Sequence, residues 1–477
     1  MHLISKMPVS VRLRRRNRRF TRSLASRLLR HIAEATAFVF LLVSATSAQI
    51  TEADRDFAVA SQQEHDEQSH GRDGKHMDHA QGQMSMEAST EEGIALPSAH
   101  ASSGTGWQPA SVPSHLWMTS RGGWELMLHG NVFLRYNQQG GPRGAGKAES
   151  ANYVMLMEQH RIGQGVLLLR EMFSAESLTS PHPGFPQLFQ TGETYHGQPL
   201  VDHQHPHNVF AELAAYYTLP IREKVTWLLY GGPSAEPALG PVTYMHRASA
   251  AENPSAPLGH HLQDSTHTSF GVVTTGFIID RFKVEASAFN GREPNEERWS
   301  IQAGALDSWS LRGSIAPGRN WTAQYSYGRL LHPEALEPGN EKRQTASLAY
   351  NHPFTAGNWA TTLVWGRKHK ELDGTNQNSY LLESTVNFRA RNYAYSRLEL
   401  VDKDELFPSV AAHPSFRIGA YTVGGVRDLV HDSAGQIGLG ADVTFYSKPA
   451  VLDQFYGANP VSFSIFLRFR PGSSHMH

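Results

Sequence analysis

The feature that most limits the fold of this chain is a two-residue alternation of apolar and polar side chains, which recurs from Trp124 to Arg470. In WELMLHGNVFLRY, which begins at Trp124, alternate positions carry Trp, Leu, Leu, Gly, Val, Leu and Tyr, and the positions between them carry Glu, Met, His, Asn, Phe and Arg. The segments FKVEASAFN, NWATTLVWGRK, YLLESTVNFRA, GLGADVTFYSK and VSFSIFLRFR have the same pattern. Because successive side chains of a strand point to opposite faces, these segments are predicted to be strands with one apolar and one polar face.

The lengths of the connections distinguish the two architectures that such strands can build. Short connections are predicted near residues 163, 279–282, 316–320 and 389–392, and long ones at 177–207, 232–267, 290–307, 332–342, 368–378, 402–415 and 448–460. Short and long connections alternate, as they do in membrane barrels with tight turns at one end and long loops at the other. A soluble β-sandwich has no reason to sort its connections in this way. We therefore predict an all-β fold, a transmembrane antiparallel β-barrel of about 16 strands (roughly 14 to 18), preceded by a disordered N-terminal segment.

The composition agrees with this prediction and excludes other classes. Mean hydropathy is −0.42, and no stretch is apolar for long enough to span a bilayer as a helix, whereas a barrel needs apolar residues only at alternate positions. The absence of cysteine excludes a disulfide framework and a thiolate metal site. A net charge of −1 provides no field that would attract nucleic acid. The expected partner of the outer surface is outer-membrane lipid. Charged residues predicted to face the interior are Lys283, Glu285, Glu383, Arg389, Asp442 and Arg468.

The N-terminal residues have the three parts of an export signal. Six arginines form a basic region: Arg12, Arg14, Arg15, Arg16, Arg18 and Arg19. The apolar core AFVFLLV follows, and SATSAQ offers small residues for cleavage after Ala48. We predict a signal peptide at residues 1–48 and export to a cell outer membrane of the Gram-negative type.

Residues 49–120 have few large apolar side chains and no period, which predicts a disordered periplasmic segment. It carries His65, His70, His76, Met77, His79, Met84 and Met86. Imidazole and thioether groups together suit copper, although a solvated linker that merely contains these residues is the alternative. The barrel is then expected at residues 121–471, followed by a short tail at 472–477 that carries His475, Met476 and His477.

Two of the long connections are rich in histidine. The first contains the stretch PLVDHQHPHNVF, with Asp202, His203, His205 and His207. In an extended backbone, side chains two residues apart point the same way. The next long connection contains Met245, His246, His260, His261, Asp264 and His267. Neutral imidazole is a good ligand for zinc, copper and nickel, and a nearby carboxylate can bind the ion or orient the ring. These ten residues are the candidate metal ligands, and a structural or pore-lining role is the alternative.

Three stretches resemble a family of bacterial outer-membrane barrels that accompany heavy-metal efflux systems: GETYHGQPLVDHQHPHNVFAEL, EPALGPVTYMHRASAAENPSAPLGHHLQDSTHTSFGVV and NGREPNEERW. The resemblance covers residues 126–470. Separately, GKHMDHAQGQMSM is similar to the Met- and His-rich leader of the copper-resistance outer-membrane B proteins. These resemblances imply a porin-like barrel, a copper or zinc ion as ligand, and periplasmic metal-efflux components as partners.

Three classes of function remain open from the sequence. The first is a channel or binding protein of the outer membrane tied to transition-metal (copper-like) homeostasis or efflux. The second is a general or solute-specific porin whose histidines are incidental. The third, an outer-membrane hydrolase, depends on DSTH (264–267), but residues so close in sequence rarely form a catalytic triad. No enzymatic activity, catalytic residue or organic cofactor is therefore expected.

Overall fold

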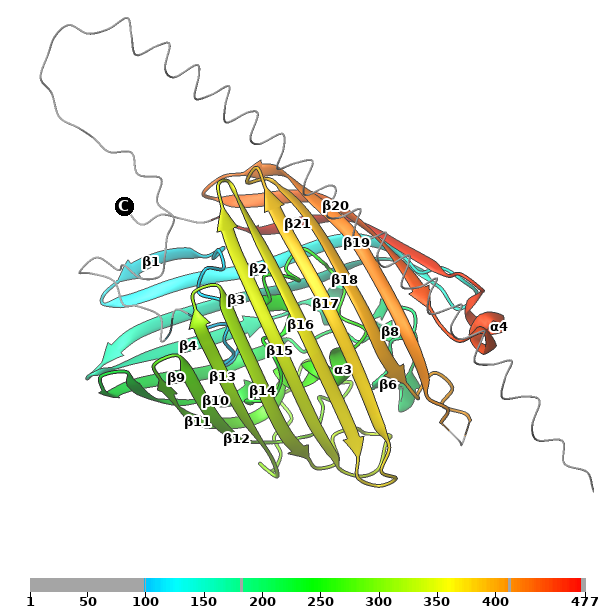
Figure 1. The fold of residues 1–477 in the computed structure, drawn as a ribbon, viewed down its shortest axis with the longest axis horizontal. Coiled ribbons are helices and arrows are strands. Elements are labelled where there is room, and N and C mark those ends of the chain that lie inside the picture. Colours follow the sequence, from blue (N-terminus) through cyan, green and yellow to red (C-terminus); the bar gives the residue numbers. More distant parts are fainter. Residues whose placement is uncertain (1–97, 99, 181–182, 411–412, 473–477) are drawn as a thin grey trace, which may run out of the picture. The chain divides into compact units, whose positions relative to one another are not determined.

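The computed structural model describes residues 98, 100–180, 183–410 and 413–472, and these residues include a closed antiparallel barrel of sixteen strands (Figure 1). The barrel closes where β2 (Trp124–Gln138) pairs with β21 (Val461–Pro471). The predicted fold class and strand number are confirmed. The predicted signal peptide, the His- and Met-bearing positions 65–86 and the residues 473–477 of the tail lie outside the described residues.

Each strand pairs with its neighbours in chain order. The fourteen strands between the two closing strands are β3 (Gly146–Ile162), β4 (Gly165–Phe173), β9 (Phe210–Arg222), β10 (Val225–Ala235), β11 (Ser269–Ile279), β12 (Phe282–Phe289), β13 (Ser308–Gly318), β14 (Trp321–Leu330), β15 (Glu341–Phe354), β16 (Gly357–Lys370), β17 (Asn376–Phe388), β18 (Asn392–Lys403), β19 (Phe416–His431) and β20 (Gly435–Ser447). Tight turns and longer loops alternate between these strands, as the sequence predicts.

Burial alternates along the wall with the same period as polarity. In β12, Phe282 and Val284 are 49% and 51% exposed, whereas Lys283 and Glu285 are 1% and 4% exposed. The polar set therefore faces the interior and the apolar set faces outward. The inward prediction fails for Arg389, which is exposed in the β17–β18 turn, where its φ is 53°. Among the described residues, no helix is long and apolar enough to cross a membrane.

The lumen is filled by the chain itself. Inward side chains that faced an open, water-filled lumen would remain exposed, yet those of β12, β13, β17 and β21 are buried. Three segments occupy the space: residues 100–116, the β4–β9 connection (residues 174–209, here loop 174–209) and the β10–β11 connection (residues 236–268, here loop 236–268). Loop 174–209 holds α2 (Glu176–Thr179), β5 (Phe185–Pro186), β6 (Glu193–Tyr195), β7 (Gln198–Leu200) and β8 (His203–Gln204). Loop 236–268 holds η1 (Tyr244–His246), α3 (His260–Gln263) and η2 (Ser265–His267).

Residues 100–116 contact the inner wall and do not form a separate segment. The carbonyl oxygen of Thr105 accepts a hydrogen bond from Lys283, and its hydroxyl accepts one from Arg312 at 2.7 Å. The Lys283 ammonium also lies 4.8 Å from the centre of the Trp107 ring. Next, β1 (Trp117–Arg121) pairs with the part of β2 that β21 leaves unpaired. Contacts with the barrel thus begin before residue 121, because wall residues far away in sequence provide partners for these polar groups.

Loop 236–268 crosses the lumen and is tied to several walls. Arg247 donates to Glu383 of β17 at 2.6 Å, and the hydroxyl of Ser249 lies 2.7 Å from that of Thr362 of β16. On another side, Glu252 accepts from Arg470 of β21 at 2.9 Å. The helix α3 packs against β16 and β17. A Cβ added at Gly366 of β16 would lie 2.2 Å from the carbonyl oxygen of Leu262, so only glycine leaves room for α3. The remaining connections include η3 (Ala450–Leu452) and α4 (Asp453–Tyr456).

Candidate functional site

Loops 174–209 and 236–268 bring five imidazoles together inside the barrel, and we refer to this place as the loop chamber. Its members are Glu176, Glu193, His205, His207, His260, His261, Asp264 and His267. Ring centres lie 5.8 Å apart for His205 and His261, and 5.1 Å apart for His260 and His267. All eight side chains lie on segments that fold into the lumen, and all five histidine residues are buried.

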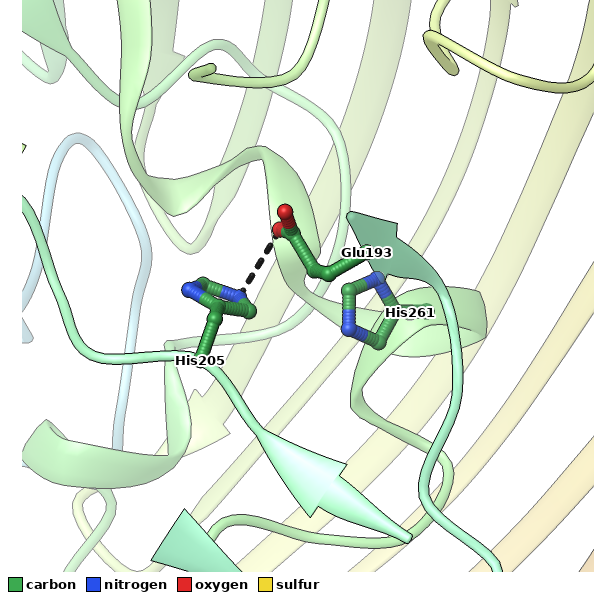
Figure 2. A group of neighbouring side chains, drawn as sticks. All are labelled: Glu193, His205 and His261. Carbon is green, nitrogen blue, oxygen red and sulfur yellow. Dashed lines mark ion pairs between the residues drawn. The ribbon is translucent and has the colours of Figure 1, made fainter. Parts of the chain in front are cut away.

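The first group in the loop chamber is Glu193, His205 and His261, which come from β6, the residue after β8, and α3 (Figure 2). One ligand atom from each lies within 4.8 Å of the other two. The Nε2 atom of His205 is 2.9 Å from Oε1 of Glu193. The other carboxylate oxygen of Glu193 accepts from Arg298 at 3.3 Å. The arrangement provides two imidazoles and one carboxylate oxygen, which is a donor set that transition-metal ions accept.

The second group is His207 and His267, whose Nε2 atoms lie 3.1 Å apart. Nδ1 of His207 is 2.7 Å from Oε2 of Glu176, and Nδ1 of His267 is 2.8 Å from the carbonyl oxygen of Asp264. His260 lies beside this pair, with its Nδ1 2.6 Å from Oδ1 of Asp264. Each of these rings is therefore oriented by an oxygen that can only accept a hydrogen bond.

Burial sets the charge states of these groups. It lowers the pKa of His205 even though Glu193 opposes the shift, and it lowers the pKa of His261 to about 3. Burial alone would raise the pKa of Glu193, but His205 and Arg298 outweigh it and hold that pKa below its usual value. Asp264 behaves similarly, because Arg247 and His260 hold its pKa low against the effect of burial. The loop chamber thus places histidines with a lowered pKa, among them His205 and His261, beside carboxylates whose pKa is held low, Glu193 and Asp264.

The candidate ligands divide into two sets in the structure. His205, His207, His260, His261, His267 and Asp264 meet in the loop chamber. His203, Asp202, His246 and Met245 do not. Nδ1 of His203 contacts the carbonyl oxygen of Val201 at 3.1 Å, and Asp202 is paired with Arg143 at 2.7 Å. The ring of His246 lies 5.2 Å from that of Tyr153, and the carbonyl oxygen of Met245 accepts from Tyr153 at 3.2 Å.

The sequence did not single out the two carboxylates that complete the loop chamber. Glu193 lies in the GETY stretch, ten residues before the histidine motif, and Glu176 lies on α2. Neither has a local pattern that marks it as a partner of His205 or His207. The only available signal was the presence of acidic residues in the same long connection.

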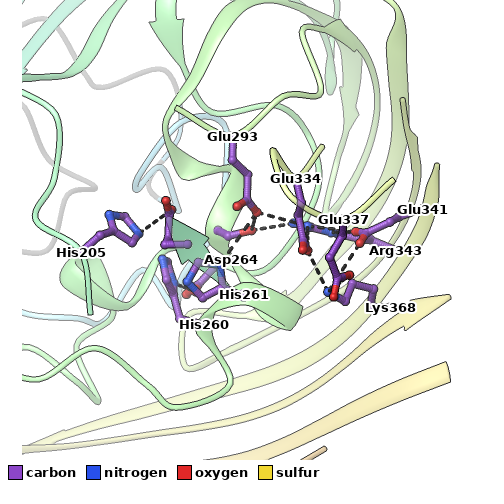
Figure 3. Close-up of polar contacts among 12 residues, drawn as sticks. His205, His260, His261, Asp264, Glu293, Glu334, Glu337, Glu341, Arg343 and Lys368 are labelled. Atoms are coloured by element: carbon purple, nitrogen blue, oxygen red, sulfur yellow. Dashed lines mark hydrogen bonds and ion pairs between the residues drawn. The ribbon is translucent and has the colours of Figure 1, made fainter. Parts of the chain in front are cut away.

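A network of charges adjoins the loop chamber on the side of β15 and β16 (Figure 3). Arg343 of β15 pairs with Glu293 at 3.2 Å, and Lys368 of β16 pairs with Glu334 at 2.8 Å. Glu337 pairs with Lys370 at 2.6 Å. One carboxylate oxygen from each of Glu334, Glu337 and Glu341 lies within 4.8 Å of the other two, but Arg343, Lys368 and Lys370 already pair with these groups. The network anchors the connections 290–307 and 331–340 to the wall.

The geometry at DSTH is not that of a hydrolase. The hydroxyl of Ser265 lies 2.5 Å from Arg343, and the His267 ring is held by the carbonyl oxygen of Asp264 and by His207. The Asp264 carboxylate binds Arg247 and His260. Serine, histidine and aspartate therefore point to different partners and form no relay for proton transfer.

Comparison with solved structures finds outer-membrane porins. The chain is similar to the anion-selective porin from Comamonas acidovorans (11% identity, TM-score 0.44, 73% of this chain and 99% of that one). It is also similar to Salmonella typhi OmpF (9%, 0.46, 74% and 99%) and to Pseudomonas putida OprB (8%, 0.44, 73% and 94%). No protein-family model and no curated protein matches the chain.

Proposed function

We propose that this protein is a porin-like channel of the outer membrane in which the chain's own interior segments control passage. The observation that carries the proposal is the contrast between an apolar exterior and a charged interior that is filled by loops and not by wall side chains alone. Exposed apolar side chains recur around the wall, among them Leu134, Val273, Leu311, Leu363 and Ile465. An apolar surface of this extent suits lipid, and a closed barrel leaves no strand edge unpaired within it.

Two small pockets between the interior segments and the wall support a route through the lumen. The first is lined by Trp107, Arg247 and Ser249 on the interior segments and by Thr322 and Thr362 on the wall. The second is lined by Gln187 and Ser255 on the two loops and by Arg397, Asp442 and Ser462 on the wall. Loop 236–268 contributes to both pockets, so its displacement would open the lumen between them. Small polar or charged solutes fit such a route better than apolar ones.

The chain contains no cysteine, which allows a clean test with an engineered disulfide. The double variant S249C/T362C would tie loop 236–268 to β16, since the two hydroxyls are 2.7 Å apart. The matched control is T422C/T444C, which joins two wall strands whose hydroxyls are 2.8 Å apart. In planar lipid bilayers, we expect ion conductance from the unmodified protein, its loss in the oxidised S249C/T362C variant and its return on reduction. Conductance that is absent from the unmodified protein, or unchanged by the loop disulfide, would refute the proposal.

A role in transition-metal homeostasis or efflux, with a copper or zinc ion as ligand and periplasmic efflux components as partners, is the second candidate. The five imidazoles of the loop chamber favour it, because they lie on the segments that control the lumen. It predicts that cells lacking the protein change their tolerance to copper or zinc, and that these ions alter the conductance of the purified barrel. A porin with incidental histidines predicts neither effect.

A further inference from the structure

One histidine of the loop chamber has a nitrogen that no hydrogen bond satisfies. His261 is 4% exposed, and its Nδ1 atom has no hydrogen-bond partner among the described residues. The closest acidic oxygen, on Glu293, is 3.8 Å away, which is too long for a hydrogen bond. A buried polar atom without a partner destabilises the fold, so this nitrogen calls for an explanation.

The backbone around His261 is shaped to hold the ring where it lies. A Cβ added at Gly192 would lie 2.6 Å from Cγ of His261, and Gly192 has a φ of +116°, which only glycine adopts readily. The imidazole therefore packs directly on the backbone that leads into Glu193. On the other side, α3 packs closely against β16 because Gly366 has no side chain. The ring is thus held beside Glu193 from two directions.

We infer that Glu193, His205 and His261 bind a first-row transition-metal ion of the zinc or copper(II) kind. The inference rests on the proposed function only in placing the ion on the loops that control the lumen. Two nitrogens and one oxygen suit zinc and copper, whereas calcium and magnesium require mostly oxygen ligands. Three protein ligands leave a fourth position for water or a solute. Arg298, which holds the second oxygen of Glu193, competes with the ion for that carboxylate and moderates the affinity.

The pair of His207 and His267 gives independent support for a cation in the loop chamber. The partners of both Nδ1 atoms, a carboxylate and a carbonyl, can only accept, so both Nδ1 atoms carry a proton. The two facing Nε2 atoms, 3.1 Å apart, then present lone pairs to each other unless a proton is shared between them or one metal ion binds both. Rings that donate from Nδ1 to an oxygen and present a bare Nε2 have the arrangement that ligating histidines adopt. We infer a second, two-histidine metal position at this pair.

The test is a titration of the purified, chelator-treated full-length barrel with Co²⁺ and Zn²⁺, followed by visible absorption and calorimetry. The unmodified protein should bind two more ions than the double variant H261A/H267A, which keeps the histidines of positions 65–79 and 475–477, with cobalt absorption typical of nitrogen and oxygen ligands. E193Q and H261A should each weaken the first site by more than about 100-fold, since loss of a supporting group alone costs 10–100-fold. The matched control is H203A, which removes an imidazole from the same motif but from outside the loop chamber.

The two sites are separated by their variants. H267A should remove the second ion and leave the first, so that the stoichiometry falls by one. Retention of unmodified affinity in both E193Q and H261A would overturn the first site, and an unchanged stoichiometry in H267A would overturn the second. An equal loss in H203A would show that binding is not specific to the loop chamber and would overturn both.

Ion conductance of the same samples reports whether each variant has folded. It also separates failure of the metal sites from failure of the channel, because a barrel that conducts without binding metal refutes only the former.

Discussion

The wall and the interior of this barrel are built by different rules. In the wall, neighbouring strands pair over long regular stretches, as β16 does with β15 and β17, and a side chain needs only to be apolar outside or polar inside. In the interior, irregular loops depend on particular pairs, such as Arg247 with Asp264 and Glu383, or Glu252 with Arg470. The wall should therefore tolerate many substitutions of one apolar residue by another outside, or of one polar residue by another inside. The interior loops should tolerate few substitutions.

The largest expected effect comes from breaking an interior pair. Arg468 of β21 is 0% exposed and contacts Glu252 of loop 236–268 and Asp428 of β19. R468M removes the buried counter-charge that Glu252 and Asp428 share and leaves only Arg470 beside Glu252 and His431 beside Asp428. Loss of one partner of a buried ion pair costs about 3–5 kcal/mol. The free energy of unfolding in urea, measured in lipid vesicles, checks this expectation.

The matched control is R281M in the β11–β12 turn, where Arg281 is exposed and 3.9 Å from Asp280. It should change the free energy of unfolding by less than about 1 kcal/mol. Equal losses in R468M and R281M would show that the interior pairs are no more specific than the surface.

The next effect tests whether lipid covers the wall. Leu363 of β16 is 50% exposed on the outer face, with Leu382 of β17 and Leu348 of β15 beside it. An arginine on the lipid-facing side near the middle of a bilayer costs about 2–4 kcal/mol. L363R should lower the free energy of unfolding by about that amount.

L372R is the control, because Leu372 is 70% exposed in the β16–β17 connection and not in the wall. It should have little effect. If L363R were as harmless as L372R, the outer face would be in contact with water and the membrane assignment would be wrong.

The wall could be predicted from sequence because its rule is local. Alternation along Trp124–Gln138 identifies both faces of β2 without any knowledge of the neighbouring strands. The alternation of short and long connections then predicts that the strands close into a barrel and do not form a sandwich. The strand number and the antiparallel order follow from that rule.

The loop chamber could be predicted only in part. Its imidazoles were visible in the sequence, but their partners come from distant positions: Glu176 meets His207 across 31 residues, and His207 meets His267 across 60. His203 does not join His205 and His207 in the loop chamber. Its Nδ1 contacts the carbonyl oxygen of Val201, and Asp202, with a φ of 60°, breaks the extended chain just before it. Glycines such as Gly192 gave no signal, because their role depends on the ring that packs against them.

The third prediction concerns pH and the packing of the interior segments. Glu236 begins loop 236–268 and packs on Gly104, and burial raises its pKa to about 8, with Arg312 opposing and Glu212 reinforcing the shift. A folded-state pKa above the unfolded value means that the folded protein binds more protons, so stability falls as pH rises from about 5 to 8. One such group contributes at most about 1.4 kcal/mol per pH unit.

E236Q should reduce this slope without abolishing it, because Glu293 and Glu405 have pKa values raised to about 7 and about 8 by burial and act in the same direction. Urea unfolding of both proteins between pH 5 and pH 9 measures the difference. An identical slope in E236Q and the unmodified protein would show that Glu236 is ionised in the folded state.

The smallest effect is expected for an ion pair that resembles those of the interior but is exposed to solvent. Arg417 of β19 and Asp402 of β18 form a two-pronged pair at 2.8 and 2.9 Å, and the Arg417 side chain is 54% exposed beside the Tyr380 ring. The geometry is as good as that of the buried pairs, but exposure to solvent and salt screens it. R417M should therefore cost less than about 1 kcal/mol, and the difference should vanish at high salt. A loss close to that of R468M would mean that geometry, and not burial, sets the strength of these pairs, and the contrast between wall and interior would then have a different cause.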